Sequence, residues 1–361
     1  MRRPLLFSAG SITILLLVAL FAAAAWFHSE LNSPYYDNTG ESYVDIPRGA
    51  TTNEISALLA HAGVLHSRFP FMIYVRYKDL GRHIQAGEYR FYKAATPEEI
   101  IQRLVHGDVY FRAVTIPEGL TAGEIIELLA KAGLGDPSEF ERGIRRTDWI
   151  RDLAPEATTL EGYLFPETYR FGRNVSSEMV IKTMVNQFRT RVSRILQHSP
   201  LHEGWTVSRI VILASMIEKE VKRPEEGPLV ASVLINRLRK GMPLACDATI
   251  IYALKIAGTY RGHLGKADLE MNSPYNSYLH LNLPPGPISN PGAGSIRAAL
   301  NPAKTDYFYY VSRNDGTHQF SRDLQSHIHA VDKFQRSPAR KVSRQTPVAT
   351  RQYSSNRASI R

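Results

Sequence analysis

Residues 44–63 read VDIPRGATTNEISALLAHAG, and residues 114–133 read VTIPEGLTAGEIIELLAKAG. Aligned at an offset of 70, the two stretches are identical at 12 of 20 positions. Each copy opens with a short strand-like segment, breaks at Pro-x-Gly, and continues through a threonine suited to cap a helix into an apolar stripe with helical spacing. Gly63 and Gly133 end the copies, and glycine is favoured where a helix stops. The repeat therefore predicts strand–turn–helix units and an α+β fold.

The segment between the copies completes a small module. Residues 86–91 alternate between apolar and polar side chains, as a strand does, and residues 97–104 have helical spacing. We expect residues 41–112 to form one α+β module. It carries neither paired carboxylates in a motif nor a phosphate-binding glycine loop, so binding or spacing is a better expectation for it than catalysis.

The second half of the chain has a different composition and a different spacing of apolar residues. Apolar positions predict longer helices over residues 207–221 and 229–238, whereas residues 241–302 are rich in Tyr, Asn, Pro and Gly. Loops of this kind on a rigid scaffold are where functional sites are usually built. We expect a larger mixed α+β domain over residues 113–332, in which residues 113–150 are a repeat-related entry segment.

The N-terminal end predicts a membrane anchor. Residues 4–27 are uncharged and mostly apolar, and Arg2 and Arg3 precede them. A helix of this length reaches about 35 Å, more than the ~30 Å hydrocarbon core of a bilayer. The positive-inside rule leaves the N-terminus in the cytoplasm, so residues 1–30 are predicted to be a cytoplasmic N-terminus and a transmembrane helix. A cleaved signal peptide, favoured by the alanines at 22–25, is the alternative, and both export the remainder.

The formal charge of +10 lies at the two ends of the chain. Residues 333–361 contain eight basic residues and no acid, and Arg2 and Arg3 supply the rest, so residues 4–332 are formally neutral. This distribution argues against a nucleic-acid-binding face and predicts a disordered basic tail over residues 333–361. The single Cys246 excludes an intramolecular disulfide and a thiolate-cluster zinc site.

Glu218 is a candidate general acid. It follows the apolar face of the helix expected at 207–221, and a carboxyl group at such a boundary can be partly desolvated. On the pattern alone, a surface glutamate paired with Lys222 at i,i+4 spacing is the better fit, because charged residues surround Glu218, and both interpretations stay open.

Other polar residues in the loops have both a functional and a structural interpretation. Glu161 and Glu167 lie in an aromatic loop, where they can bind substrate or accept backbone hydrogen bonds. Asp247 stands where it can cap the helix expected from residue 248. Asn276 and Asn290 lie among Pro, Ser and Tyr and can simply shape turns.

Seven motifs in unbroken order resemble one family. They are LEGYLFPETY (160–169), ASMIEKEV (214–221), PLVASVLINRL (228–238), DATIIYAL (247–254), SPYNSY (273–278), LPPGPISNPG (283–292) and SIRAALNPAKTDYFYYV (295–311). This set closely resembles the YceG-like family, the MltG-type endolytic murein transglycosylases, over roughly residues 40–332. Cys246 departs from the small hydroxyl residue expected there, and Glu167 from an aspartate. The basic tail lies outside the resemblance.

The resemblance implies an N-terminal transmembrane helix, a LysM-like module and a catalytic domain with one general acid/base glutamate. By motif position that glutamate is Glu218. The same motifs supply candidate substrate-binding residues, and no metal or organic cofactor is implied. These candidates are Glu161, Glu167, Asn236, Arg237, Asp247, Tyr252, Asn276, Tyr278 and Asn290.

The implied protein is a peptidoglycan lytic transglycosylase, a carbon–oxygen lyase. It would cut nascent glycan strands between N-acetylmuramic acid and N-acetylglucosamine from the outer face of the cytoplasmic membrane, beside membrane-bound synthases and without a nucleic-acid partner. A non-catalytic cell-wall-binding scaffold protein and a hydrolase are the competing hypotheses.

Overall fold

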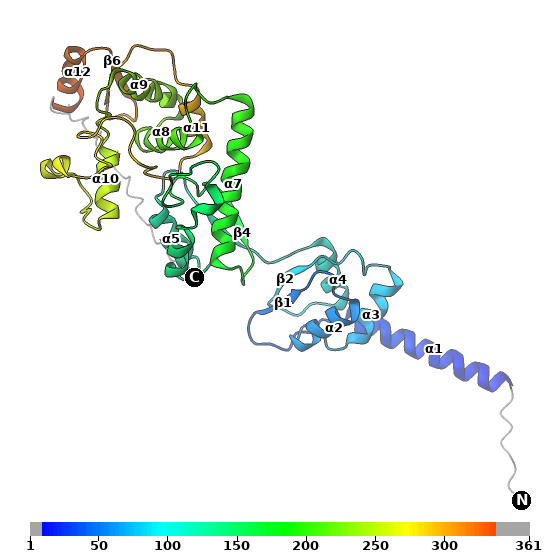
Figure 1. Cartoon of the computed structure of the whole chain (residues 1–361). Coiled ribbons are helices and arrows are strands. Elements are labelled where there is room, and N and C mark those ends of the chain that lie inside the picture. Colours follow the sequence, from blue (N-terminus) through cyan, green and yellow to red (C-terminus); the bar gives the residue numbers. More distant parts are fainter. Residues whose placement is uncertain (1–8, 337–361) are drawn as a thin grey trace, which may run out of the picture. The chain divides into compact units, whose positions relative to one another are not determined.

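The computed structural model describes residues 9–336, and Figure 1 labels its helices and strands. The described residues form two compact units. The first comprises residues 9–218 and 286–296, and the second comprises residues 219–285 and 297–336. The first unit is therefore discontinuous in sequence, because the segment 286–296 comes from late in the chain.

The N-terminal apolar run forms one unbroken helix, α1 (Ala9–Asn32), as predicted (Figure 1). The stretch Ile12–Asn32 has a mean hydropathy of 2.1 and none of its hydrophobic window is buried within the protein. The helix continues past residue 27, where the uncharged run ends, and two residues past the predicted end of the anchor segment at residue 30. In its last turn Asn32 Nδ2 donates to the His28 carbonyl at 2.7 Å, and Leu31 is buried. These properties are compatible with a single-pass membrane anchor.

The first repeat copy builds a β–α–α–β module. Strand β1 (Ser42–Ile46) pairs antiparallel with β2 (Gly87–Phe91), and helices α2 (Thr52–His61) and α3 (Arg68–Tyr77) lie between them in sequence. Helix α4 (Pro97–His106) follows. The predicted strand and helix between the copies are confirmed. Leu59, Phe71, Tyr89 and Ile100 meet in the module's core and are buried, which explains the alternating and helical apolar patterns.

The second copy repeats this order. Strand β3 (Arg112–Thr115) pairs antiparallel with β4 (Thr168–Phe171), and α5 (Ala122–Lys131), α6 (Pro137–Gly143) and the short 3₁₀ helix η1 (Thr147–Ile150) intervene. In both copies a complete capping box starts the first helix, through Thr51 and Glu54 or Thr121 and Glu124. The repeat in the sequence is thus a repeated supersecondary structure.

The first unit also contains the long helix α7 (Ser177–His198) and most of α8 (Val207–Glu220). In α8, every residue from Ile210 to Ile217 is buried. Gly162 lies where a loop passes close to this helix, because a β-carbon there would lie 2.5 Å from Pro287 and 2.9 Å from Val211. With φ at +87°, that position also favours glycine.

The second unit is built mainly from helices and one hairpin. It contains η2 (Pro224–Glu226), α9 (Gly227–Lys240), α10 (Asp247–Ile256), η3 (Lys266–Glu270), α12 (Leu324–Val331) and the terminal π-helical turn η4 (Asp332–Arg336). Strand β5 (Tyr309–Ser312) pairs antiparallel with β6 (His318–Ser321). Helix α11 (Ala293–Leu300) has residues in both units. The fold is mixed α+β, as expected, and most of the predicted tail, residues 337–361, lies outside the described residues.

Candidate active site around Glu218

Glu218 lies where α8 leaves the core. The eight residues before it, Ile210 to Ile217, are all buried, whereas the Glu218 side chain is half-buried. The helix ends at Glu220, so Lys222 lies beyond it and a regular i,i+4 helical pair is not formed. The expectation of a carboxyl group at the edge of an apolar face matches this placement.

A late loop of the chain is fastened to α8 beside this glutamate. The Ile288 N–H donates to Ser215 Oγ at 3.0 Å, and Ser289 Oγ donates to the Ser215 carbonyl at 3.1 Å. Ser215 is fully buried and lies one helical turn before Glu218. These bonds fix the loop that ends at Gly292.

Gly292 contacts Glu218 directly. Its N–H donates to Glu218 Oε2 at 3.0 Å, and its carbonyl accepts from the Ile296 N–H at 3.2 Å, so Gly292 stands at the start of α11. The N-terminus of a helix carries a partial positive charge, which stabilises a nearby carboxylate. The hydrogen bond occupies one carboxyl oxygen and orients the group.

A second carboxyl group lies against the same glycine. A β-carbon on Gly292 would lie 1.7 Å from Glu118 Oε1 and 2.0 Å from Glu118 Cδ, so the Glu118 side chain fills that space. Because backbone N and Cβ of one residue are about 2.5 Å apart, the carboxyl oxygens of Glu118 and Glu218 lie within about 7 Å of each other. Glu118 was not among the residues predicted from the sequence.

The turn that carries Glu118 is held by Asn290. The Gly119 N–H donates to the Asn290 carbonyl at 2.9 Å, and the Asn290 N–H donates to the Leu120 carbonyl at 2.8 Å. The Asn290 side chain donates to the Leu120 carbonyl and to Glu161 Oε1, and accepts from the Leu164 N–H. With no exposed surface, Asn290 supports this loop through its hydrogen bonds, and its role as a substrate ligand stays a prediction.

The two glutamates of the aromatic loop are also held by protein groups. Glu161 is 5% exposed and accepts from the Ala122 N–H at 3.0 Å, which places its charge at the N-terminus of α5. Glu167 forms an ion pair with Arg191 at 2.8 Å and accepts a hydrogen bond from Gln187. For Glu161 the backbone-binding interpretation is the one that the geometry favours, whereas Glu167 keeps about a third of its side-chain surface exposed.

Three candidates in the second unit fix the path of its loops. Asn236 Nδ2 donates to the carbonyls of Thr305 and Tyr307 at 2.9 and 3.0 Å. Arg237 Nε donates to the Phe308 carbonyl at 2.6 Å, and its guanidinium lies 5.2 Å from the Tyr309 ring centroid. Asn276 has no exposed surface and donates to the carbonyls of Leu269 and Met271, and its role as a substrate ligand stays a prediction, as for Asn290.

The remaining candidates surround the start of α10. Asp247 is not the helix cap, which is a correction: Cys246 occupies that position, and Asp247 Oδ1 accepts from the Tyr278 hydroxyl at 2.6 Å. Tyr278 is more than a third exposed, and burial and the hydrogen bond to Asp247 raise the pKa of its phenol. Tyr252 is mostly buried, with its ring 4.9 Å from that of Tyr275.

A buried thiol–carboxyl pair was also missed. Cys246 Sγ donates to Glu220 Oε1 at 2.8 Å, and burial raises the pKa of both the thiol and the carboxyl group. The thiol therefore stands in for the hydroxyl group that the motif led us to expect at residue 246.

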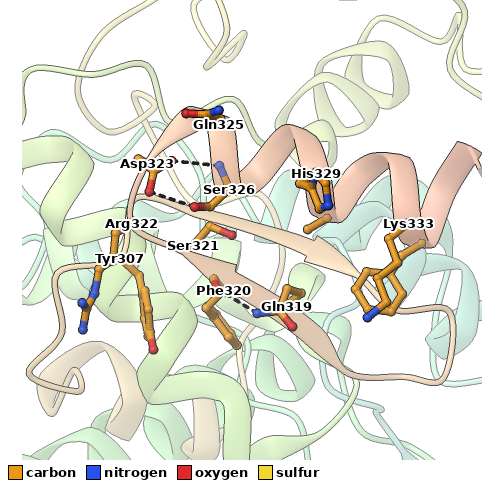
Figure 2. A pocket seen from close by; sticks show the side chains of 12 residues that line it. Tyr307, Gln319, Phe320, Ser321, Arg322, Asp323, Gln325, Ser326, His329 and Lys333 are labelled. Atoms are coloured by element: carbon orange, nitrogen blue, oxygen red, sulfur yellow. Dashed lines mark hydrogen bonds between the residues drawn. The ribbon is translucent and has the colours of Figure 1, made fainter.

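A separate cavity of about 850 Å³ lies between β6 and α12. Figure 2 shows its polar rim, where the Asp323 carboxylate accepts two hydrogen bonds from Ser326, at 2.8 and 2.9 Å. Residues that line it include Tyr307, Arg322 and Lys333. None of the site residues predicted from the sequence lines this cavity.

Among residues 9–336, no group of three or more His, Cys, Asp or Glu side chains is arranged to hold a metal ion. What the site does offer is a half-buried carboxyl group on a rigid helix, oriented by a backbone amide, with a second carboxyl group nearby. Such an arrangement suits proton transfer to and from a substrate oxygen and stabilisation of a developing positive charge.

Comparisons with known proteins agree with this chemistry. The model of the YceG-like family matches residues 44–333. An endolytic murein transglycosylase of Bacillus subtilis is 33% identical over 307 residues, which cover 81% of this chain and 84% of that protein. One from Streptococcus pneumoniae strain R6 is 29% identical over 342 residues, covering 83% of this chain and 60% of the longer relative.

The fold has a solved counterpart as well. The crystal structure of a YceG-like protein from Listeria monocytogenes aligns with a TM-score of 0.54 and 31% sequence identity, covering 81% of this chain and 99% of that one. The matched residues contain both repeat copies, Glu118, Glu218 and the Gly292 loop. The chain belongs to the YceG-like family.

Proposed function

We propose that this chain is an endolytic lytic transglycosylase of peptidoglycan, and that Glu218 is its general acid and base. The observation that carries the proposal is the half-buried Glu218 carboxyl group, oriented by the Gly292 N–H, in a chain whose relatives are named endolytic murein transglycosylases. The substrate is a glycan strand of alternating N-acetylglucosamine and N-acetylmuramic acid.

The reaction needs one proton to leave Glu218 and one to return. Glu218 protonates the glycosidic oxygen, and the bond from that oxygen to C1 of the muramic acid breaks with the electron pair staying on oxygen. The C6 hydroxyl of the same sugar then bonds to C1, while its proton passes to the Glu218 carboxylate. The products are a free N-acetylglucosamine hydroxyl and a 1,6-anhydromuramic acid end.

This chemistry explains why one proton-transferring carboxyl group suffices. Ordinary glycosidases use a second carboxylate to activate water or to attack the sugar. Here the nucleophile is a hydroxyl group of the substrate itself, so neither role is needed. The reaction also requires no metal ion and no organic cofactor.

The products of purified glycan strands test the proposal. A lytic transglycosylase releases anhydromuramic ends, a hydrolase releases reducing ends that are heavier by one water, and a non-catalytic scaffold protein releases nothing. Mass spectrometry separates the three outcomes. Reducing ends or intact strands would refute the proposed reaction.

Glu218→Gln tests the residue. The amide keeps the size of the side chain and cannot transfer the proton, and general acid–base groups contribute about 10²–10⁴-fold in rate. We expect a loss of that order at an unchanged melting temperature. Glu203→Gln, at an exposed position of the same unit, is the matched control and keeps wild-type activity. Retention of most activity by the Glu218 variant would remove it from the mechanism.

The β–α–α–β order of residues 42–91 supports a LysM-like role for the predicted module at 41–112, which would hold the glycan strand. Binding of this module to insoluble peptidoglycan, measured by co-sedimentation, tests that role. A module that stays in the supernatant would contradict it.

The apolar helix α1 supports a single-pass anchor in the cytoplasmic membrane. Arg2 and Arg3 favour a cytoplasmic N-terminus, which puts the catalytic domain outside, near membrane-bound synthases. Protease added to intact spheroplasts would then digest the catalytic domain, whereas its protection would reverse the orientation.

A further inference from the structure

We propose that Glu118 is a second catalytic carboxylate of this site, whose negative charge faces the sugar carbon that becomes positive as the glycosidic bond breaks. The inference rests on the proposed function and adds a residue to it. It starts from one feature of the geometry, namely that the Glu118 carboxyl group occupies the space where Gly292 lacks a side chain.

Geometry places this group in the same site as Glu218. The Gly292 N–H binds Glu218, while the Gly292 α-carbon faces Glu118, so one backbone residue lies between the two carboxyl groups. The two carboxyl groups are at most about 7 Å apart, which is below the ~9.5 Å upper limit at which pairs of carboxyl groups act on one glycosidic bond. A sugar positioned at Glu218 is therefore within reach of Glu118.

The internal repeat supplies an independent argument. The two copies share the Pro-x-Gly turn, and Gly49 and Gly119 have similar backbone angles, with φ of +79° and +77°. At the central position of that turn the first copy has Arg48 and the second copy has Glu118. The acid is therefore not required to form the turn, and it occurs in the copy that reaches Gly292.

The surroundings hold the turn in place. Paired backbone hydrogen bonds join residues 119 and 120 to Asn290, and Asn290 is fixed in turn by Leu164 and Glu161. This support positions Glu118 through its backbone and leaves its side chain on an exposed part of the turn. A carboxylate on a rigid turn can stabilise a developing charge without reorganising during the reaction.

The charge at C1 explains what a second carboxylate adds. As the bond to the leaving oxygen breaks, the muramic acid ring becomes oxocarbenium-like and gains positive charge. Glu118 stabilises that charge and neither gives nor takes a proton, so the proton balance through Glu218 is unchanged. The C6 hydroxyl remains the nucleophile, and the anhydro product is the same.

The experiment compares four full-length proteins on purified glycan strands: wild type, Glu118→Gln, Glu118→Asp and the control Glu127→Gln. Glu127 is an exposed residue of α5, where it pairs with Lys131 at 3.8 Å, so its variant makes the same change of charge outside the site. We measure kcat, KM, melting temperature and the mass of the products.

We expect Glu118→Gln to lower kcat about 100-fold, the effect typical of losing one preorganised electrostatic group, with KM little changed and anhydro ends as the product. Glu118→Asp recovers part of kcat because it keeps the charge, and Glu127→Gln matches the wild type. Wild-type kcat in Glu118→Gln overturns the inference. Equal losses of kcat in the Gln and Asp variants, with lower melting temperatures, also overturn it, because they indicate a structural role. If the wild type releases no anhydro ends, it is the proposed function that fails.

Discussion

Gly292 has three functions that only a glycine combines at this position. Its N–H binds Glu218, its carbonyl starts α11, and its missing β-carbon leaves room for the Glu118 carboxyl group. A methyl group there would overlap Glu118 Oε1, which would lie 1.7 Å away. The residue therefore sets the spacing of the two carboxyl groups.

Gly292→Ala is expected to lower activity by about 100-fold, since a displacement of roughly 1 Å at a reacting group has an effect of that size. The free energy of unfolding falls by about 1–3 kcal/mol from overpacking. Gly294→Ala is the matched control, because a β-carbon at Gly294, inside α11, meets nothing within 4 Å. Kinetics and denaturation of both variants check the prediction. Full activity in Gly292→Ala would mean that the spacing is not critical.

Cys246 is expected to be chemically inert in the native protein. Burial, helped by the neighbouring Glu220, raises the pKa of the thiol, so little reactive thiolate is present near pH 8. A disulfide reagent should label Cys246 slowly under native conditions and rapidly in denaturant, where the pKa returns to its ordinary value. Fast native labelling would show that the thiol is accessible and that its bond to Glu220 is not maintained.

Some residues of the candidate site could be predicted from the sequence, and others could not, for physical reasons. Glu218 followed from its motif, and the end of an apolar helix face agreed with it. Asn290 has loop surroundings in the sequence like those of ligand residues, but its hydrogen bonds go to distant partners such as Glu161, which the local sequence does not show. Glu118 was visible as the substitution for Arg48 between the repeat copies, yet its contact with Gly292 spans more than 170 residues of chain.

At the scale of elements, the two repeat copies fold alike because their local signals are the same. Each has a strand that ends at Pro-x-Gly and a capping box that starts the next helix. Each first helix is followed by a glycine in the left-handed region, Gly63 or Gly133. Such signals act over a few residues, and this is why the opening strand and first helix of each copy were predicted from the sequence, while β4 and its pairing with β3 were not.

The capping boxes give a prediction for the helices. Thr51→Ala and Thr121→Ala each remove the side chain that accepts the N–H of the third helical residue, and each should cost about 1 kcal/mol of stability. Only Thr121→Ala should also lower activity, because its helix follows the turn that carries Glu118. Urea denaturation and the glycan assay check both variants. Equal activities of the two variants would contradict this prediction, because they would mean that the stability of α5 does not affect the position of Glu118.

At the scale of the whole molecule, residues 31–332 are expected to form a soluble and active protein. The segments removed are the apolar helix and the basic tail, and the family match starts at residue 44. Leu31 is retained, and it is buried in the structure. Light scattering and the glycan assay check this. An insoluble or inactive product would show that α1 is needed to form the site.

The proposed membrane anchor α1 should matter in cells rather than in the test tube. Tethering raises the effective concentration of the enzyme near the membrane, where new strands emerge. A form released by a cleavable signal peptide should keep its activity in vitro but lose control of strand length in vivo. Glycan-strand length distributions at matched protein abundance provide the measurement. Identical distributions for both forms would mean that the anchor serves export alone.

The discontinuity of the first unit has a bearing on biosynthesis. The loop with Asn290 and Gly292 belongs to the unit of Glu218, yet residues 219–285 of the other unit precede it in the chain. In the proposed orientation, a chain that crosses the membrane N-terminus first presents Glu118 and Glu218 before the backbone that orients them. If the proposed site and orientation hold, we expect cutting of the wall to begin only after residue 292 has crossed the membrane, so fragments that end before residue 286 should be inactive.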